Sequence, residues 1–272
     1  EFVVYSEKTL RYLAKYGKRS KIHLFYNSGM NREGVKDLKK FLELNQKYLD
    51  KISLVGFCSH LSSAEEKTVL NQAQEDKFFR GLLLLREAGY FPTWIHLGNS
   101  ASALTNNNSL LTAYRPGLAL YGYNPLSEED DNNFYFSSKL QPALRVTSSV
   151  VFVQNLEANE PVSYNSSYRA REKTNIAIVP FGYFEGLDRR LSNQGEFLIH
   201  DFWAQIAGKV CMNITCLDVG QNNVRIGDRV LLISSDPSAP NSVMAIASLM
   251  NTISYEVLVK LQASIHREIV WK

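Results

Sequence analysis

Short apolar runs alternate with amphipathic segments along the first half of the chain. The apolar runs predict strands at 2–5, 22–26, 52–57 and 94–97. Apolar residues at nearly helical spacing predict helices at 7–16, 35–49 and 69–88, and Gly89 ends the last of these. Strands that alternate with helices are typical of a parallel sheet, either doubly wound or closed into a barrel.

Polar residues follow the ends of these predicted strands: Arg32, His60, Asn99, Ser100 and Arg115. In a (β/α)8 barrel the functional groups lie at the carboxyl ends of the strands, so we expect these side chains to meet at one edge. The first half of the chain offers about four strands where such a barrel has eight. If this sheet belongs to a barrel, the chain holds the C-terminal half of the (β/α)8 barrel and the first half lies outside this sequence.

The pattern changes after an acidic stretch at 127–133, where we place the boundary between domains 1–128 and 134–272. Beyond it, strands are predicted at 146–153, 175–181, 196–199, 204–210, 214–219 and 229–233, with turns that contain Gly and Asn. Helices are predicted near the end, at 243–250 and 255–261. This succession predicts a mostly antiparallel β domain, either barrel-like or a sandwich.

Composition narrows the class of protein. At 272 residues with 45% hydrophobic residues, the chain can bury a sizeable core in one large or two ordinary domains. The net charge of +3 is small, and the basic residues of the chain are interspersed with acidic ones, so we expect no nucleic-acid partner. No apolar run is long enough to span a bilayer, and the N-terminus lacks the pattern of a signal peptide. We expect a cytoplasmic protein without a membrane partner. The sequence does not begin with Met, which indicates a fragment.

The three cysteines, Cys58, Cys211 and Cys216, are too few for a disulfide framework. Cys58 and His60 lie close in sequence, but no second Cys/His pair stands at the spacing of a zinc site. We expect buried thiols and no metal.

The stretch 113–122 joins the two halves of the chain. Its residues 118–121 form a short apolar run, expected to be buried, and Arg115 precedes it beside a Pro-Gly turn. Such an arginine suits an anionic ligand, although an ordinary surface arginine explains these residues at least as well. Motifs for a P-loop, a Rossmann dinucleotide site and an esterase serine are all absent.

Five stretches in series carry a resemblance: 28–34 (SGMNREG), 114–122 (YRPGLALYG), 161–168 (PVSYNSSY), 178–190 (IVPFGYFEGLDRR) and 207–213 (AGKVCMN). Together they resemble the alanine racemases, which are fold-type III enzymes that use pyridoxal 5'-phosphate. The resemblance implies a cofactor-binding barrel, a C-terminal β domain and a homodimer with shared active sites. It also implies two-base interconversion of L-alanine and D-alanine, with D-alanine for bacterial cell-wall synthesis.

The resemblance assigns roles to single residues. It implies that Arg115 faces the ring nitrogen of the cofactor, that His60 links Arg115 to the catalytic base Tyr164 of the other subunit, and that Arg32 binds the substrate carboxylate. Further positions assigned to the cofactor, chiefly to its phosphate, are Asn99, Ser100, Gly117, Leu118 and Tyr255. Met212 and Tyr183 match the substrate pocket; apart from the family, these two would be β-domain core and Tyr255 a core or interface tyrosine.

The chain also departs from the family pattern. No lysine matches the setting of the Schiff-base lysine, which in the family lies early in the barrel. Phe25 stands where many members carry a carbamylated lysine, and Asn27, Glu185 and Asn213 replace usual aspartates. The missing lysine and Phe25 keep one alternative open: a truncated or degenerate homologue that retains only dimerisation or ligand binding. Apart from these departures, an amino-acid racemase of broader specificity is a variant of the first interpretation.

Overall fold

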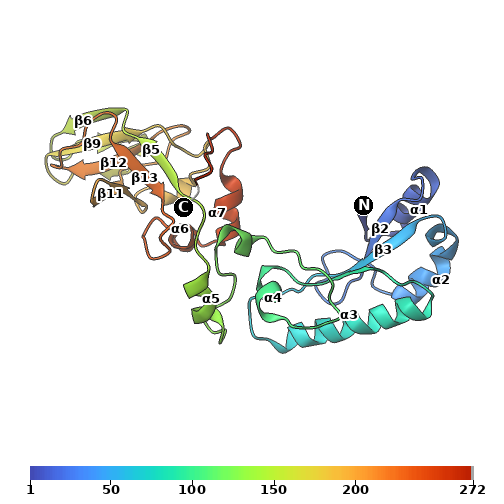
Figure 1. The fold of residues 1–272 in the computed structure, drawn as a ribbon. Coiled ribbons are helices and arrows are strands. Elements are labelled where there is room, and N and C mark those ends of the chain that lie inside the picture. The colour runs from blue at the N-terminus through green and yellow to red at the C-terminus, as the bar shows by residue number, and fades with distance from the viewer. Residues whose placement is uncertain (271–272) are drawn as a thin grey trace. The chain divides into compact units, whose positions relative to one another are not determined.

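The structure is a computed structural model that describes residues 1–270. The chain forms two compact units, Glu1–Leu140 (unit 1) and Gln141–Lys272 (unit 2), shown in Figure 1. The acidic stretch at 127–133 lies within unit 1, and helix α5 (Asn133–Lys139) completes that unit. The division between the units falls just after this helix.

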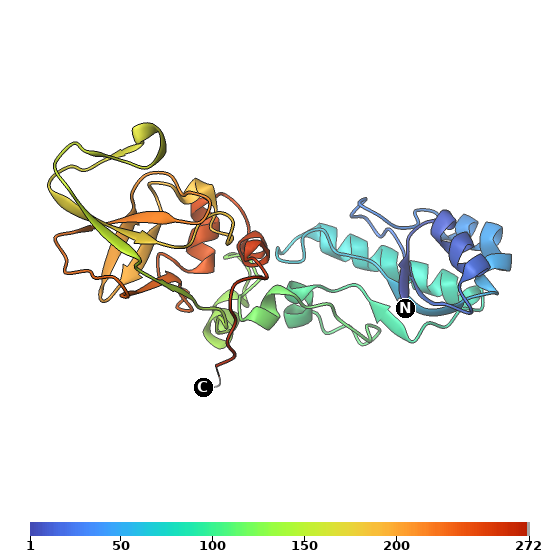
Figure 2. The ribbon, with the colours of Figure 1, turned by 90° about the horizontal axis from the view of Figure 1, so that it is seen from above.

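Unit 1 is built on a parallel sheet of four strands in the order β1-β2-β3-β4. The strands are β1 (Phe2–Val4), β2 (Lys21–Phe25), β3 (Ser53–Cys58) and β4 (Trp94–His96). The connecting helices are α1 (Glu7–Tyr16), α2 (Leu38–Leu49) and α3 (Val69–Glu87). Helix α2 packs against both α1 and α3, and Figure 2 shows this helical layer along the strands. This is the predicted C-terminal half of a (β/α)8 barrel.

Short polar residues explain where the helices begin. The Ser6 side chain accepts a hydrogen bond from the Thr9 amide at the start of α1, and the Thr68 side chain caps α3 in the same way. Helix α2 begins at Leu38, later than the predicted residue 35, because Asp37 caps it and Val35 instead pairs with Tyr26. Tertiary pairing therefore removed the first turn of the predicted helix.

The apolar run at 118–121 differs from its prediction. It forms a short 3-10 helix, η1 (Leu118–Tyr121), that follows helix α4 (Ser100–Thr105). Leu118 is buried, whereas Leu120 and Tyr121 are 73% and 55% exposed. A four-residue turn can bury only one side, so an apolar sequence all round does not make the whole turn interior.

Unit 2 is dominated by a seven-stranded sheet in the order β5-β13-β10-β11-β12-β9-β6, with antiparallel pairing throughout. Its strands are β5 (Val146–Ser149), β6 (Phe152–Leu156), β9 (Thr174–Val179), β10 (Glu196–Ile199), β11 (Phe202–Ile206), β12 (Thr215–Gly220) and β13 (Arg229–Ile233). The remaining elements are the ribbon β7 (Pro161–Val162) and β8 (Tyr168–Arg169), the 3-10 turns η2 (Tyr164–Ser166) and η3 (Arg189–Leu191), and helices α6 (Val243–Leu249) and α7 (Ser254–Lys260).

The predicted strand 146–153 is in fact two strands. Between β5 and β6 the Val150 amide bonds to Asp228 and the Val151 amide bonds to Ile178. The break lets β5 and β6 occupy opposite edges of the same sheet although only two residues separate them. The sheet must therefore curl until its edges meet, which selects the barrel-like alternative over the sandwich.

Within residues 1–270, no single helix has the length and apolar composition to cross a membrane; α6 and α7 meet those criteria only as a pair bent by 105°. The thiols of Cys58 and Cys216 are buried and that of Cys211 is half-buried, all three unpaired. In the same residues no three His, Cys, Asp or Glu side chains gather as metal ligands.

Candidate active site

Arg115 is the centre of a hydrogen-bond cluster at the carboxyl ends of the unit 1 strands. Its Nη1 donates to Nδ1 of His96 at 2.6 Å, and its Nη2 donates to Nδ1 of His60 at 3.0 Å. Nη2 also donates to the carbonyl of Ser59 at 2.7 Å. The Arg115 side chain is also half-buried. Because these hydrogen bonds hold it on several sides, the alternative of an ordinary surface arginine is wrong.

The arginine determines which ring nitrogen of each histidine carries a proton. A guanidinium only donates, so Nδ1 of His60 and of His96 must each be bare, and the proton of each neutral ring lies on Nε2. Burial, followed by the charge of Arg115, lowers the pKa of His96 to about 4. The same causes, in the same order, lower the pKa of His60. Both rings are thus neutral at pH 7.

The hydrogen bonds continue from His96 to the edge of the sheet. With its proton on Nε2, His96 donates to Nδ1 of His23 at 2.8 Å. His23 then donates from Nε2 to the carboxylate of Glu1 at 2.9 Å. The result is an ordered chain of hydrogen bonds from the Arg115 guanidinium through the rings of His96 and His23 to the Glu1 carboxylate.

Gly56 makes the contact between these histidines possible. His23 lies on β2 and His96 on β4, so β3 separates their backbones. A side chain at Gly56 would place its Cβ 2.1 Å from Nδ1 of His23. Our reading of the sequence missed both histidines; the signal that could have found them is the glycine inside a strand, which indicates close approach of other groups.

The predicted phosphate-binding residues of unit 1 lie around the start of η1. Ser100 is fully buried, and its Oγ accepts from the amide of Gly117 at 2.7 Å and from that of Ala119 at 3.3 Å. The side chain of Asn99 caps α4 through the Ser102 amide. Within residues 1–270 the Leu118 amide makes no hydrogen bond, which leaves a donor at this point.

Arg32 lies on the loop that follows β2. Its Nε and Nη2 form a forked pair with Glu33, at 2.5 and 2.7 Å. The buried Asn27 shapes this loop, because its Oδ1 accepts from the amides of Gly29 and Asn31. A carbonyl oxygen suffices for those bonds, which explains why an asparagine can stand where the family usually has an aspartate.

In unit 2, Tyr164 sits on a loop of unusual backbone conformation. Ser163, Asn165 and Ser166 have φ values of 62°, 60° and 49° although none is a glycine. The Ser163 hydroxyl donates to the carbonyl of Lys209 at 2.9 Å and ties the loop to the segment before Cys211. The Tyr164 side chain is left 64% exposed. Such strain persists only where surrounding contacts hold it, and it is typical of functional sites.

Tyr183 and Met212 are brought together on neighbouring loops. The Tyr183 amide bonds to the carbonyl of Cys211 and the next amide bonds to that of Met212. The two side chains are 44% and 54% exposed, so the alternative of β-domain core is wrong. Glu185 accepts from Asn213 at 2.9 Å, so two of the residues that replace family aspartates pair with each other.

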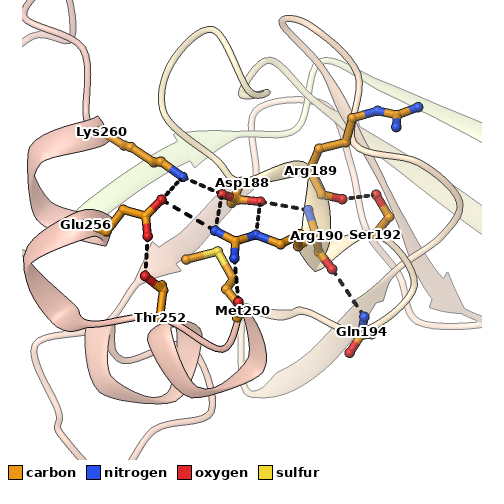
Figure 3. Close-up of polar contacts among 9 residues, drawn as sticks. All are labelled: Asp188, Arg189, Arg190, Ser192, Gln194, Met250, Thr252, Glu256 and Lys260. Atoms are coloured by element: carbon orange, nitrogen blue, oxygen red, sulfur yellow. Dashed lines mark hydrogen bonds and ion pairs between the residues drawn. The ribbon is translucent and has the colours of Figure 1, made fainter.

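Helix α7 carries Tyr255, whose side chain is 39% exposed. Figure 3 shows the cluster of charged side chains that holds this helix. Asp188 accepts from both Nε and Nη2 of Arg190 at 3.0 Å and from Nζ of Lys260 at 2.6 Å. Lys260 also pairs with Glu256, one turn earlier on the helix. These bonds, chiefly that from Arg190, hold the pKa of Asp188 well below its usual range. The cluster thereby sets where α7 lies against η3.

Comparison with known proteins identifies the relatives of this arrangement. Residues 1–125 match the N-terminal domain model of alanine racemase, and residues 143–269 match its C-terminal domain model. Alanine racemase of Lactobacillus acidophilus is 33% identical over 254 residues, which cover 91% of this chain and 65% of the relative. The chain thus spans slightly less than two thirds of that relative.

Two further relatives agree with this result. Alanine racemase of Leptospira interrogans is 33% identical, over 99% of this chain and 71% of the relative. The crystal structure of the Bacillus anthracis alanine racemase with bound L-Ala-P superposes with a TM-score of 0.85 at 28% identity, over 96% of this chain and 68% of that one. On its sequence and on its fold, the chain belongs to the alanine racemase family.

Proposed function

We propose that this chain carries most of the active site of an alanine racemase that depends on pyridoxal phosphate and works with two bases. The observation that carries the proposal is the clamp on Arg115, which holds a donor-only side chain and two neutral histidines at the strand ends. The resemblance places the Schiff-base lysine ahead of these motifs, and we propose that the active protein includes that lysine.

The residues of unit 1 fit the cofactor. Both terminal nitrogens of Arg115 are engaged by unit 1, whereas its Nε makes no hydrogen bond within residues 1–270. One donor therefore remains for the ring nitrogen. In unit 1, Ser100, Gly117 and Leu118 would hold the phosphate; the resemblance also assigns Tyr255, on α7 of unit 2, to the phosphate. When bound, pyridoxal phosphate stabilises negative charge at the α-carbon of an amino acid. Because Arg115 keeps its proton, the ring nitrogen stays unprotonated and the electron sink is moderate, which suits return of the proton.

Tyr164 is proposed as one of the two bases. A free tyrosine has a pKa of about 10, so it needs a nearby donor or cation to act as a base at neutral pH. Arg115 occupies Nδ1 of His60, so this ring can offer only its Nε2 proton. A hydrogen bond from that proton to the partner subunit's Tyr164 would favour the phenolate and so its role as a base.

The other proposed roles concern the substrate. Arg32 would bind the alanine carboxylate, since a guanidinium matches a carboxylate in shape and charge. Tyr183 and Met212, from the partner, would line the small pocket. We propose a homodimer with shared sites, located in the cytoplasm, whose D-alanine serves peptidoglycan synthesis. The alternative is a homologue without catalysis that keeps dimerisation or ligand binding, and Phe25 is the residue that favours it.

Absorption spectroscopy and a racemisation assay test the proposal on protein expressed from its native gene. An intact mass above the 30.9 kDa of this chain, an absorption band that borohydride removes and interconversion of both alanine enantiomers are expected. A protein that binds pyridoxal phosphate and dimerises but converts neither enantiomer would support the alternative.

A further inference from the structure

We propose that Glu33 is a positioning residue that holds Arg32 in the orientation in which it receives the substrate carboxylate. The choice of substrate rests on the proposed function, whereas the pairing of Glu33 with Arg32 does not. No motif of the sequence analysis assigned a role to Glu33.

Backbone hydrogen bonds join the two ends of the loop that carries Arg32 and Glu33. The Asn27 amide bonds to the carbonyl of Val35 at 3.0 Å, and the Val35 amide bonds to that of Phe25 at 2.9 Å. Gly34, at a φ of 104°, passes so close that a Cβ would lie 2.8 Å from the Phe25 ring. Arg32 and Glu33 therefore project from a short loop with little freedom to move.

The pair itself has the geometry of a fork. Both carboxylate oxygens of Glu33 accept from Arg32, one from Nε at 2.5 Å and one from Nη2 at 2.7 Å. The Glu33 side chain is 25% exposed and that of Arg32 is 56% exposed, so the carboxylate is the deeper group. Two parallel bonds fix the plane of the guanidinium and leave Nη1 free to meet a second carboxylate.

The surroundings explain why an anion is needed at this place. The charge of Arg32 acts on both Arg115 and His60, so two guanidiniums share this end of the sheet. Arg115 bonds to histidines and carbonyls, and within residues 1–270 Glu33 is the one carboxylate that bonds to either arginine. Phe25 ends the strand before the loop, and its side chain offers no polar group. Glu33 thus supplies the negative charge that the strand does not.

The electrostatic pattern agrees with this placement. The hydrogen bonds from Arg32 hold the pKa of Glu33 below its usual range, so Glu33 is ionised at neutral pH. Burial and the charge of Arg115 lower the pKa of His60, and the charge of Glu33 opposes this shift. Burial raises the pKa of the Cys58 thiol, and the charge of Glu33 adds to that rise. Glu33 therefore acts on the same groups that surround Arg115.

Kinetics of Glu33→Gln test the orientation. Glutamine keeps the size of the side chain but gives up one of the two acceptors and the charge. We expect kcat for alanine to fall about tenfold or more while KM stays level or falls, because an unneutralised Arg32 still attracts carboxylate but no longer holds it in place. Formate, added to Glu33→Ala as a small carboxylate, should restore part of kcat. The control is Glu7→Gln, which breaks the exposed pair with Arg11 and should leave kcat unchanged.

A second readout does not need turnover. In the wild-type chain the Nε proton of Arg32 should exchange slowly with solvent in nitrogen-resolved NMR spectra, and Glu33→Gln should abolish that protection. An unchanged kcat, or equal exchange in both proteins, overturns the proposal; a higher kcat would mean that Glu33 blocks Arg32. If the wild type converts no alanine but the protection is lost in Glu33→Gln, the proposed function fails while the orienting pair stands.

Discussion

The two units prepare their functional groups in opposite ways. In unit 1, Arg115, His60 and His96 are half-buried or buried and satisfy one another, so their charges and protons are set within the unit. In unit 2, Tyr164, Tyr183 and Met212 are exposed, and a strained backbone rather than a hydrogen-bond network holds the tyrosine out. The functional groups of unit 1 are therefore hydrogen-bonded to one another within the unit. Those of unit 2 are exposed and free to contact another molecule. The difference agrees with the proposal that each site takes groups from two subunits.

The largest effect is expected from Tyr164→Phe, which tests the exposed side of the comparison. Loss of the hydroxyl removes one proposed base, so racemisation should fall about 10²- to 10⁴-fold. Exchange of the α-proton in heavy water should disappear for one enantiomer of alanine and persist for the other. Tyr168→Phe is the matched control. Tyr168 lies on the same β7–β8 ribbon as Tyr164, and its substitution removes a hydroxyl that is hydrogen-bonded to Asp218 on β12. Equal loss for both enantiomers, with loss of the cofactor, would contradict the role.

Gly56→Ala tests the hydrogen-bonded groups of unit 1. The new Cβ would collide with the His23 ring, so the free energy of unfolding should drop by about 2–3 kcal/mol and the His23–His96 bond should break. Chemical denaturation measures the first effect. In a His23→Ala background the same substitution should cost less than about 1 kcal/mol, because the collision is gone. Equal costs in the two backgrounds would show that His23 is not the obstacle.

Asp188→Asn tests how unit 2 holds α7. Loss of the charge at the centre of the cluster should lower the free energy of unfolding by about 2 kcal/mol at pH 7. The folded pKa of Asp188 is depressed, so its contribution is present above the pKa of the unfolded carboxyl and is lost as pH falls through the folded value. The difference between wild type and variant should therefore shrink below about pH 4. A difference independent of pH would contradict this account.

The smallest effect is expected from Asn165→Gly on the Tyr164 loop. Asn165 has a φ of 60°, which glycine adopts without a Cβ penalty, so the substitution should raise the free energy of unfolding by less than about 1 kcal/mol. Asn175→Gly, in strand β9, should instead destabilise, because glycine weakens a strand. Thermal unfolding of the pair gives the comparison. A destabilising Asn165→Gly would mean that the loop is not strained there.

Much of this molecule follows from its sequence, for identifiable reasons. The parallel sheet was predictable because apolar runs and helical spacing alternate. Strand-end position brought Arg115, His60 and Arg32 to notice, whereas the resemblance to the family assigned their roles. The chain His96–His23–Glu1 was not, since it joins residues on β4, β2 and the start of the chain across a glycine in β3. The break between β5 and β6 escaped as well, because apolar sequence continues through a point where only pairing partners change. Local pattern thus predicts elements and their ends, whereas contacts between distant strands decide which side chains meet.

Arg115 fixes two neutral histidines with their protons on Nε2, and the proposed roles of the site residues depend most on this arrangement. Nitrogen NMR of the five histidines, labelled in the ring and assigned by single substitutions, tests it directly at pH 7. We predict that His60 and His96 each show a bare Nδ1 and a protonated Nε2, and that His96 stays neutral until the pH approaches its pKa of about 4. A proton on Nδ1 of either ring, or a doubly protonated ring at pH 7, would contradict the clamp and the roles that we derive from it.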